Sequence, residues 1–75
     1  MSDTEARTLR WYRLRKFMKQ EDLARAVEVS VQTVRSWEAG KTTPRVTQLR
    51  ALSEALGVGA EELLEALDYT KKEVA

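Results

Sequence analysis

Residues 20–44, with the sequence QEDLARAVEVSVQTVRSWEAGKTTP, decide how this chain folds. In the first half, Leu23 and Val27 lie four residues apart, which places them on one face of a two-turn helix. In the second half, Val34 and Trp37 lie three residues apart and form a second apolar face. The few residues between these patterns leave room only for a tight turn, so the sequence predicts two short helices set at a steep angle.

The second of these helices, predicted over about residues 31–39, has an outer face without large apolar groups. Ser30 precedes it and is a typical N-cap residue. At about 100° per residue, Val34 and Trp37 share one side of this helix with Ser30. The opposite side carries Gln32, Arg35, Ser36 and Ala39. An amide, a guanidinium and a hydroxyl are groups that read base edges in the major groove of DNA.

The stretch resembles the helix-turn-helix of the Cro/cI-type (XRE, lambda-repressor-like) DNA-binding family. The positions that carry the resemblance are Gln20, Leu23, Ala24, Val29, Ser30, Thr33, Val34, Trp37, Glu38, Gly40 and Pro44. Matching positions outside the stretch are Leu9, Tyr12, Arg13, Leu49, Leu52, Leu56, Gly57, Val58, Glu62, Leu63 and Leu64. The resemblance covers roughly residues 7–67 and implies an all-α, compact five-helix lambda-repressor-like domain.

The domain is expected over residues 6–69, with its motif at about 20–39. We expect helix one at about residues 6–17, a fourth helix capped by Thr47, and a fifth helix from Ala60 to about Leu67. Residues 1–5 are predicted to be a disordered lead, with Asp3 and Thr4 as possible helix caps, and residues 70–75 a frayed tail.

Three positions differ from the family pattern. Lys19 stands where the family often has a Ser or Thr cap, while Phe17 and Glu28 stand where Gly is frequent. If the backbone at Glu28 is left-handed, its side chain costs about 1–2 kcal/mol relative to Gly. Otherwise, the turn takes a different path.

On helix one, Trp11 and Leu14 form an additional apolar stripe, which is either a protein-contact patch or a surface that packs under the C-terminal residues.

Composition narrows the possible functions. Seventy-five residues make one domain, and the chain has neither Cys nor His. The sequence therefore offers no disulfide, no Cys/His zinc site and no histidine acid–base chemistry, and we expect no metal, no cofactor and no enzymatic activity. No apolar run approaches the roughly 20 residues of a membrane span, and no signal peptide follows Met1. The expected location is cytoplasmic, with no membrane partner.

Charge is segregated along the chain although the net charge is only +1. Counting Lys and Arg against Asp and Glu gives +4 for residues 1–20 and −2 for residues 21–40. The same count gives +3 for residues 41–50 and −4 for residues 51–75. Basic segments thus flank the predicted motif on both sides, which suits a protein that turns one face toward a polyanion.

The resemblance implies which residues would contact DNA. Candidates for base contact on the outer face of helix three are Val31, Gln32, Arg35 and Ser36, with Gln32 placed to pair with adenine. Candidates for phosphate contact are Gln20, Ser30, Lys41, Thr43, Arg45 and Arg10. Arg13 and Glu38 match an ion pair that ties helix one to the end of helix three in this family.

These features favour a sequence-specific, double-stranded-DNA-binding transcriptional regulator, with repression as the favoured role. We expect a homodimer, at least on DNA, and a pseudo-palindromic operator, because one helix reads few base pairs. The alternative is a protein-interaction module, such as an antitoxin or coactivator bridge, in which Trp11 and Leu14 would supply the contact.

Overall fold

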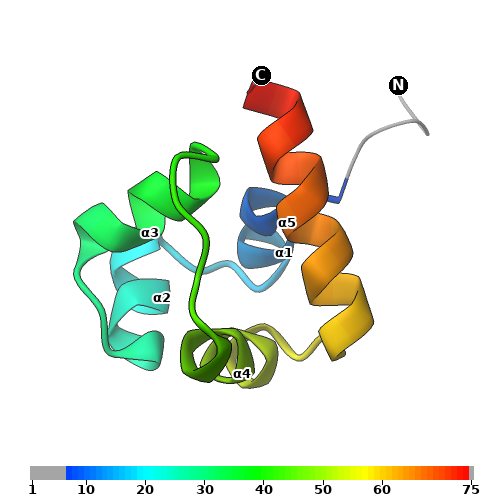
Figure 1. Ribbon diagram of the computed structural model, residues 1–75. Helices are drawn as coiled ribbons and strands as arrows, with labels where there is room; N and C mark the ends of the chain where they lie inside the picture. Colours follow the sequence, from blue (N-terminus) through cyan, green and yellow to red (C-terminus); the bar gives the residue numbers. More distant parts are fainter. Residues whose placement is uncertain (1–6, 75) are drawn as a thin grey trace.

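The computed structural model describes residues 7–74, which form five helices and contain no strand. In chain order the helices are α1 (Leu9–Arg15), α2 (Gln20–Val27), α3 (Val31–Glu38), α4 (Val46–Leu56) and α5 (Ala60–Val74) (Figure 1). The predicted all-α, five-helix fold is therefore confirmed. The predicted lead at residues 1–5, with its possible caps Asp3 and Thr4, lies outside the described residues.

The helices surround one core. Figure 1 shows α2 and α3 on one side of the molecule and α1 with α5 on the other, while α4 lies across the bottom of the view. Residue contacts join α2 to α3 and α4, α5 to α1 and α4, and α1 to α3. Trp37 is the largest fully buried side chain, at 2% exposure. The other buried apolar residues are Leu9, Tyr12, Leu23, Ala24, Val27, Val34, Leu52, Leu56, Leu63, Ala66 and Leu67.

The turn between α2 and α3 is as short as the sequence predicted. Glu28 ends α2 in the left-handed region, with φ 63° and ψ 47°. The next amide, that of Val29, donates back to the carbonyl oxygen of Ala24 at 2.9 Å. Ser30 then caps α3, because its hydroxyl accepts a hydrogen bond from the backbone N–H of Thr33 at 3.1 Å. Three residues thus set the orientation of α3 on α2.

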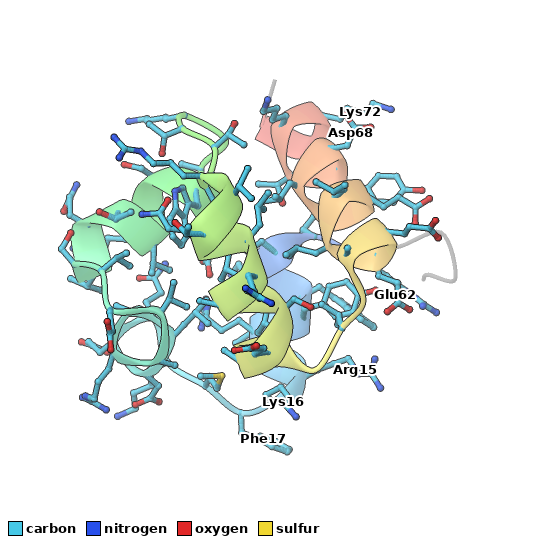
Figure 2. The ribbon with its side chains drawn as sticks, turned by 60° about the horizontal axis from the view of Figure 1, so that its bottom comes forward. Arg15, Lys16, Phe17, Glu62, Asp68 and Lys72 are labelled. Carbon is cyan, nitrogen blue, oxygen red and sulfur yellow. The ribbon has the colours of Figure 1, made fainter. Side chains whose placement is uncertain are left out.

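Helix α1 is shorter than the predicted range of about residues 6–17. Thr8 caps it at the N-terminal end, where its hydroxyl accepts from the N–H of Trp11 at 3.2 Å. At the other end Phe17 takes a left-handed conformation, with φ 57°, which ends the helix. The four-residue spacing of Leu9, Arg13 and Phe17 would place all three on the core face of a longer helix. The side chain of Phe17 is instead 94% exposed and points outward beside Lys16 (Figure 2).

Helix α4 begins differently from the prediction that Thr47 caps it. Its N-cap residue is Arg45, and Thr47 lies inside the first turn. The backbone N–H of Arg45 donates to the side-chain oxygen of Gln48 at 2.8 Å, so Gln48 supplies the return half of a capping box. Gly57 ends the helix with a left-handed φ of 68°.

Helix α5 continues beyond Leu67 to Val74, so the predicted frayed tail at residues 70–75 is wrong as far as Val74. The reason is Thr70, which is only 2% exposed. Its hydroxyl accepts from the backbone N–H of Leu9 at 3.0 Å and donates to the carbonyl oxygen of Ala66 at 2.8 Å. The last turns of α5 are therefore fastened to the start of α1.

Candidate nucleic-acid interface

The two faces of α3 differ as the sequence pattern predicts. Val34 is 0% exposed and Trp37 is 2% exposed, so this side anchors the helix to the core. On the other side Gln32 and Arg35 are exposed to solvent. The remaining two candidates for base contact are Val31, which is half-buried and packs partly against the core, and Ser36, which is also half-buried.

Two of the four candidate residues of α3, Gln32 and Ser36, border a shallow hollow of about 420 Å³ between α3 and the start of α4. The segment that joins the two helices runs across the front of the molecule in Figure 1. The hollow is lined by Ser30, Gln32, Thr33, Ser36, Trp37, Thr42, Thr43, Arg45 and Gln48. The fold thus brings Gln32 and Ser36 together with three candidates for phosphate contact, Ser30, Thr43 and Arg45.

The other candidates for phosphate contact lie elsewhere. Lys41 is exposed just after α3, where its backbone N–H donates to the carbonyl oxygen of Ser36 at 3.0 Å. Arg10 is exposed on α1 and is not among the residues that line the hollow. Gln20 is half-buried at the start of α2, and its side chain is hydrogen-bonded within the protein.

A buried ion pair joins the C-terminal end of α3 to α1. Arg13 Nε lies 2.6 Å from Glu38 Oε2, and Arg13 Nη2 donates to Glu38 Oε1 at 3.1 Å. The third nitrogen, Nη1, donates to the carbonyl oxygen of Met18 at 2.8 Å. The two side chains are 7% and 6% exposed, so the guanidinium and the carboxylate satisfy each other away from water.

The sequence matches a family described as helix-turn-helix over residues 9–63, which is more than half of the chain. The chain belongs to this XRE-type helix-turn-helix family. A curated relative, the HTH-type transcriptional regulator DdrOP3 from Deinococcus deserti, is 30% identical over 61 residues. The match covers 81% of this chain but 47% of the relative, so the chain spans about half the length of that protein. No solved structure matches.

The apolar stripe of Trp11 and Leu14 on α1 is only partly open to solvent in this helix-turn-helix domain. Trp11 is half-buried, packs against the core and meets the ring of Tyr12 edge-on at 4.9 Å between centroids. The guanidinium carbons of Arg7 and Arg15 lie 5.2 and 5.0 Å from the centroid of the indole ring. Only Leu14 remains well exposed, at 46%.

Several features of the helix-turn-helix surface were missed by the sequence reasoning. Thr33, Thr42 and Gln48 line the hollow although none was a candidate. For Gln48, the signal was its position three residues after Arg45, which is the spacing of a capping box. Thr33 lies three residues after Ser30, and their hydroxyls are 2.9 Å apart.

Two further properties hold for the part of the chain that the structure describes. It contains no cluster of three or more Asp, Glu, His or Cys side chains that could hold a metal ion. None of its helices has the length and apolar character needed to cross a bilayer.

Proposed function

We propose that this protein is a sequence-specific, double-stranded-DNA-binding transcriptional regulator that acts as a repressor by placing α3 in the major groove. The observation that supports this most directly is the shared surface. Gln32 and Ser36 of α3 line the same hollow as Ser30, Thr43 and Arg45, so polar groups that can read bases share one surface with groups that can bind phosphate. Membership of the helix-turn-helix family and the regulator named above point in the same direction.

The residues divide into two roles by position. Gln32, near the N-terminus of α3, pairs through its amide with adenine, and Arg35, one turn later, contacts guanine. Ser36 contacts either base, and Val31 reaches a thymine methyl with the part of its side chain that the core leaves open. The phosphate contacts come from Ser30, Lys41, Thr43, Arg45 and Arg10. The amide of Gln20, which the resemblance also makes a candidate, is hydrogen-bonded to Glu38 and Arg35 within the protein.

The active form is a homodimer on a pseudo-palindromic operator, because one short helix discriminates too few base pairs. For its interface we favour the groove between α4 and α5 over the stripe of Trp11 and Leu14. This groove, of about 380 Å³, is lined mostly by apolar side chains: Val46, Leu49, Arg50, Ser53, Glu54, Ala60, Leu63 and Leu64. Val46 is 80% exposed and Leu64 is 56% exposed. Arg50 and Glu54, which carry opposite charges, also line the groove.

A regulator of this kind needs no reaction and no cofactor. The proposed location is cytoplasmic. The decisive experiment is selection from random double-stranded oligonucleotides, followed by sequencing and by footprinting of the selected site. We expect a discrete footprint with two related halves about 34 Å apart, one helical turn of DNA. Salt-sensitive binding without any base preference would refute sequence-specific reading.

A further inference from the structure

A chain of side-chain hydrogen bonds runs from the buried ion pair to the proposed DNA-reading face. Glu38 Oε1, which accepts from Arg13, also accepts from the amide nitrogen of Gln20 at 3.0 Å. The amide oxygen of Gln20 in turn accepts from Nε of Arg35 at 3.3 Å. Gln20 therefore lies between an anion held in the interior and a cation on the surface.

The direction of the Gln20 amide is fixed by its neighbours. An ionised carboxylate only accepts hydrogen bonds, and a guanidinium only donates them. The nitrogen of the amide must therefore face Glu38, and its oxygen must face Arg35. Because Glu38 is held by two hydrogen bonds from Arg13, the amide cannot turn over without leaving both Glu38 and Arg35 opposite a group of the wrong kind.

This arrangement determines which part of Arg35 is available to a ligand. Nε is engaged with Gln20, so the edge formed by the two terminal nitrogens is the part of the guanidinium that a ligand can approach. An exposed Arg otherwise loses side-chain entropy when it is immobilised. A guanidinium held in place before binding loses less freedom on contact, which favours the bidentate geometry that distinguishes guanine.

We propose that Gln20 is a positioning residue that orients the guanidinium of Arg35 for base reading, and that Glu38 sets the direction of the Gln20 amide. The inference rests on the proposed function, since it assigns Arg35 to a base. It differs from the role of Gln20 expected from the family resemblance, in which the amide serves as a phosphate ligand. The two roles predict different effects on base preference and on salt dependence.

The first test uses the DNA-free protein. Nuclear magnetic resonance relaxation of the Arg35 Nε–H bond gives its order parameter in the parent, in Gln20→Ala and in Glu38→Gln, which keeps the shape of Glu38 but not its charge. We expect the Arg35 bond to become more mobile in both variants. Glu21→Ala is the matched control, since Glu21 is an exposed neighbour on the same turn. An Arg35 order parameter unchanged by Gln20→Ala would overturn the proposal.

The second test uses operator DNA. The base pair that Arg35 reads is the one at which Arg35→Ala loses preference. Gln20→Ala should lower the ratio of affinities for operator DNA and for DNA changed at that base pair by about two- to tenfold, the effect of one hydrogen bond. The dependence of the affinity on salt should stay unchanged. In a protein that already carries Arg35→Ala, adding Gln20→Ala should not lower this affinity ratio further. Uniform weakening on all sequences, with the salt slope lowered by about one, would make Gln20 a phosphate ligand and overturn the proposal. If the proposed function itself is wrong, the parent protein will already bind all DNA sequences alike, so the two failures can be distinguished.

Discussion

At the scale of single residues, two side chains stand in a backbone conformation that ordinarily belongs to glycine. Phe17 and Glu28 have φ of 57° and 63°, and each ends a helix. The helix that follows in each case starts within three residues, so the chain has no room for a gradual turn. The geometry of the motif is therefore maintained against local preference by the packing of α1, α2 and α3.

Replacing either residue with glycine should relieve this conflict. A left-handed residue with a Cβ costs about 1–2 kcal/mol, whereas glycine loses more chain entropy on folding, so the two effects partly cancel. We expect Glu28→Gly and Phe17→Gly to leave the free energy of unfolding unchanged or to raise it by up to about 1 kcal/mol. Denaturant titration measures this.

The control for these variants is Glu65→Gly, since Glu65 is exposed inside the right-handed helix α5. It should lower the free energy of unfolding by about 0.5–1 kcal/mol. Destabilisation of the Glu28→Gly protein by as much as this control would contradict the account of the turn.

The Arg13–Glu38 pair should dominate stability among the ion pairs of the described residues. Glu38→Ala leaves the Arg13 guanidinium, now 7% exposed, without its carboxylate. Removing one partner of a buried pair typically costs about 3–5 kcal/mol, a large fraction of the stability of a small domain. Thermal or denaturant unfolding of the variant should therefore begin far below the midpoint of the parent.

The comparison variant is Asp68→Ala. Asp68 lies 3.3 Å from Lys72 on the outside of α5, and both side chains are more than half exposed (Figure 2). Breaking this surface pair should change the free energy of unfolding by less than about 1 kcal/mol. If Glu38→Ala costs no more than Asp68→Ala, the buried pair does not hold α3 in place.

At the scale of elements, α3 and the segment that follows it should affect DNA binding in different ways. Gln32 projects from α3, whereas Lys41 and Arg45 lie beyond its end. Loss of a bidentate amide–adenine pair should cost about 1–3 kcal/mol, and only on operators that carry that base pair. Gln32→Ala should thus flatten the preference at one position in each half-site while the salt dependence stays nearly the same.

Lys41→Ala and Arg45→Ala provide the contrast. Each should weaken binding to all sequences alike and lower the salt slope by about one for each phosphate contact removed. Binding titrations at several salt concentrations, on operator and on scrambled DNA, separate the two patterns. Equal loss on both DNAs for Gln32→Ala would assign it to the backbone and leave base reading to Arg35 and Ser36.

The helices also show which features a sequence can predict. Apolar spacing predicted the buried faces of α2 and α3, because that spacing records which side of a helix is buried. The ends were less predictable, because they depend on partners. Thr70 looked like part of a polar tail, and only its bond to Leu9, which is 61 positions away, makes it part of the fold. Phe17 is a similar case, because it lies four residues after buried Arg13, the spacing of a residue on the same helical face, although its own side chain is exposed.

At the scale of the whole molecule, the groove between α4 and α5 should control assembly. Leu64 is 56% exposed in the free domain, so Leu64→Glu should leave the free energy of unfolding within about 0.5 kcal/mol of the parent. Both copies lose a leucine from the twofold interface, and each is only about half exposed before association. Dimerisation should therefore weaken by about ten- to hundredfold. Sedimentation measures the effect, with and without operator DNA.

The matched control is Leu14→Glu, since Leu14 has a similar exposure of 46% on α1. It should leave assembly unchanged. The reverse result, with Leu14→Glu breaking the dimer and Leu64→Glu leaving it intact, would move the interface to α1. A selected site with one unrepeated half and one-to-one stoichiometry would exclude the dimer altogether.

The candidate site was only partly predictable for a related reason. The outward direction of Gln32 follows from its position relative to Val34 and Trp37, which lie on the same helix. The bonds of Gln20 to Glu38 and Arg35 join residues 18 and 15 positions apart, so they depend on the angle between α2 and α3. A single sequence gives that angle only approximately, and side-chain hydrogen bonds require it to within a fraction of an ångström.

The bond between Leu9 and Thr70 also has a consequence for synthesis. A ribosome makes the chain from the N-terminus, so the amide of Leu9 emerges long before the hydroxyl that accepts from it. The contact between α1 and α5 can form only when nearly the whole domain has left the exit tunnel, so the domain should be completed late. A nascent chain stalled with residue 70 still inside the tunnel should leave the Leu9 amide open to hydrogen exchange. Release from the ribosome should then protect it.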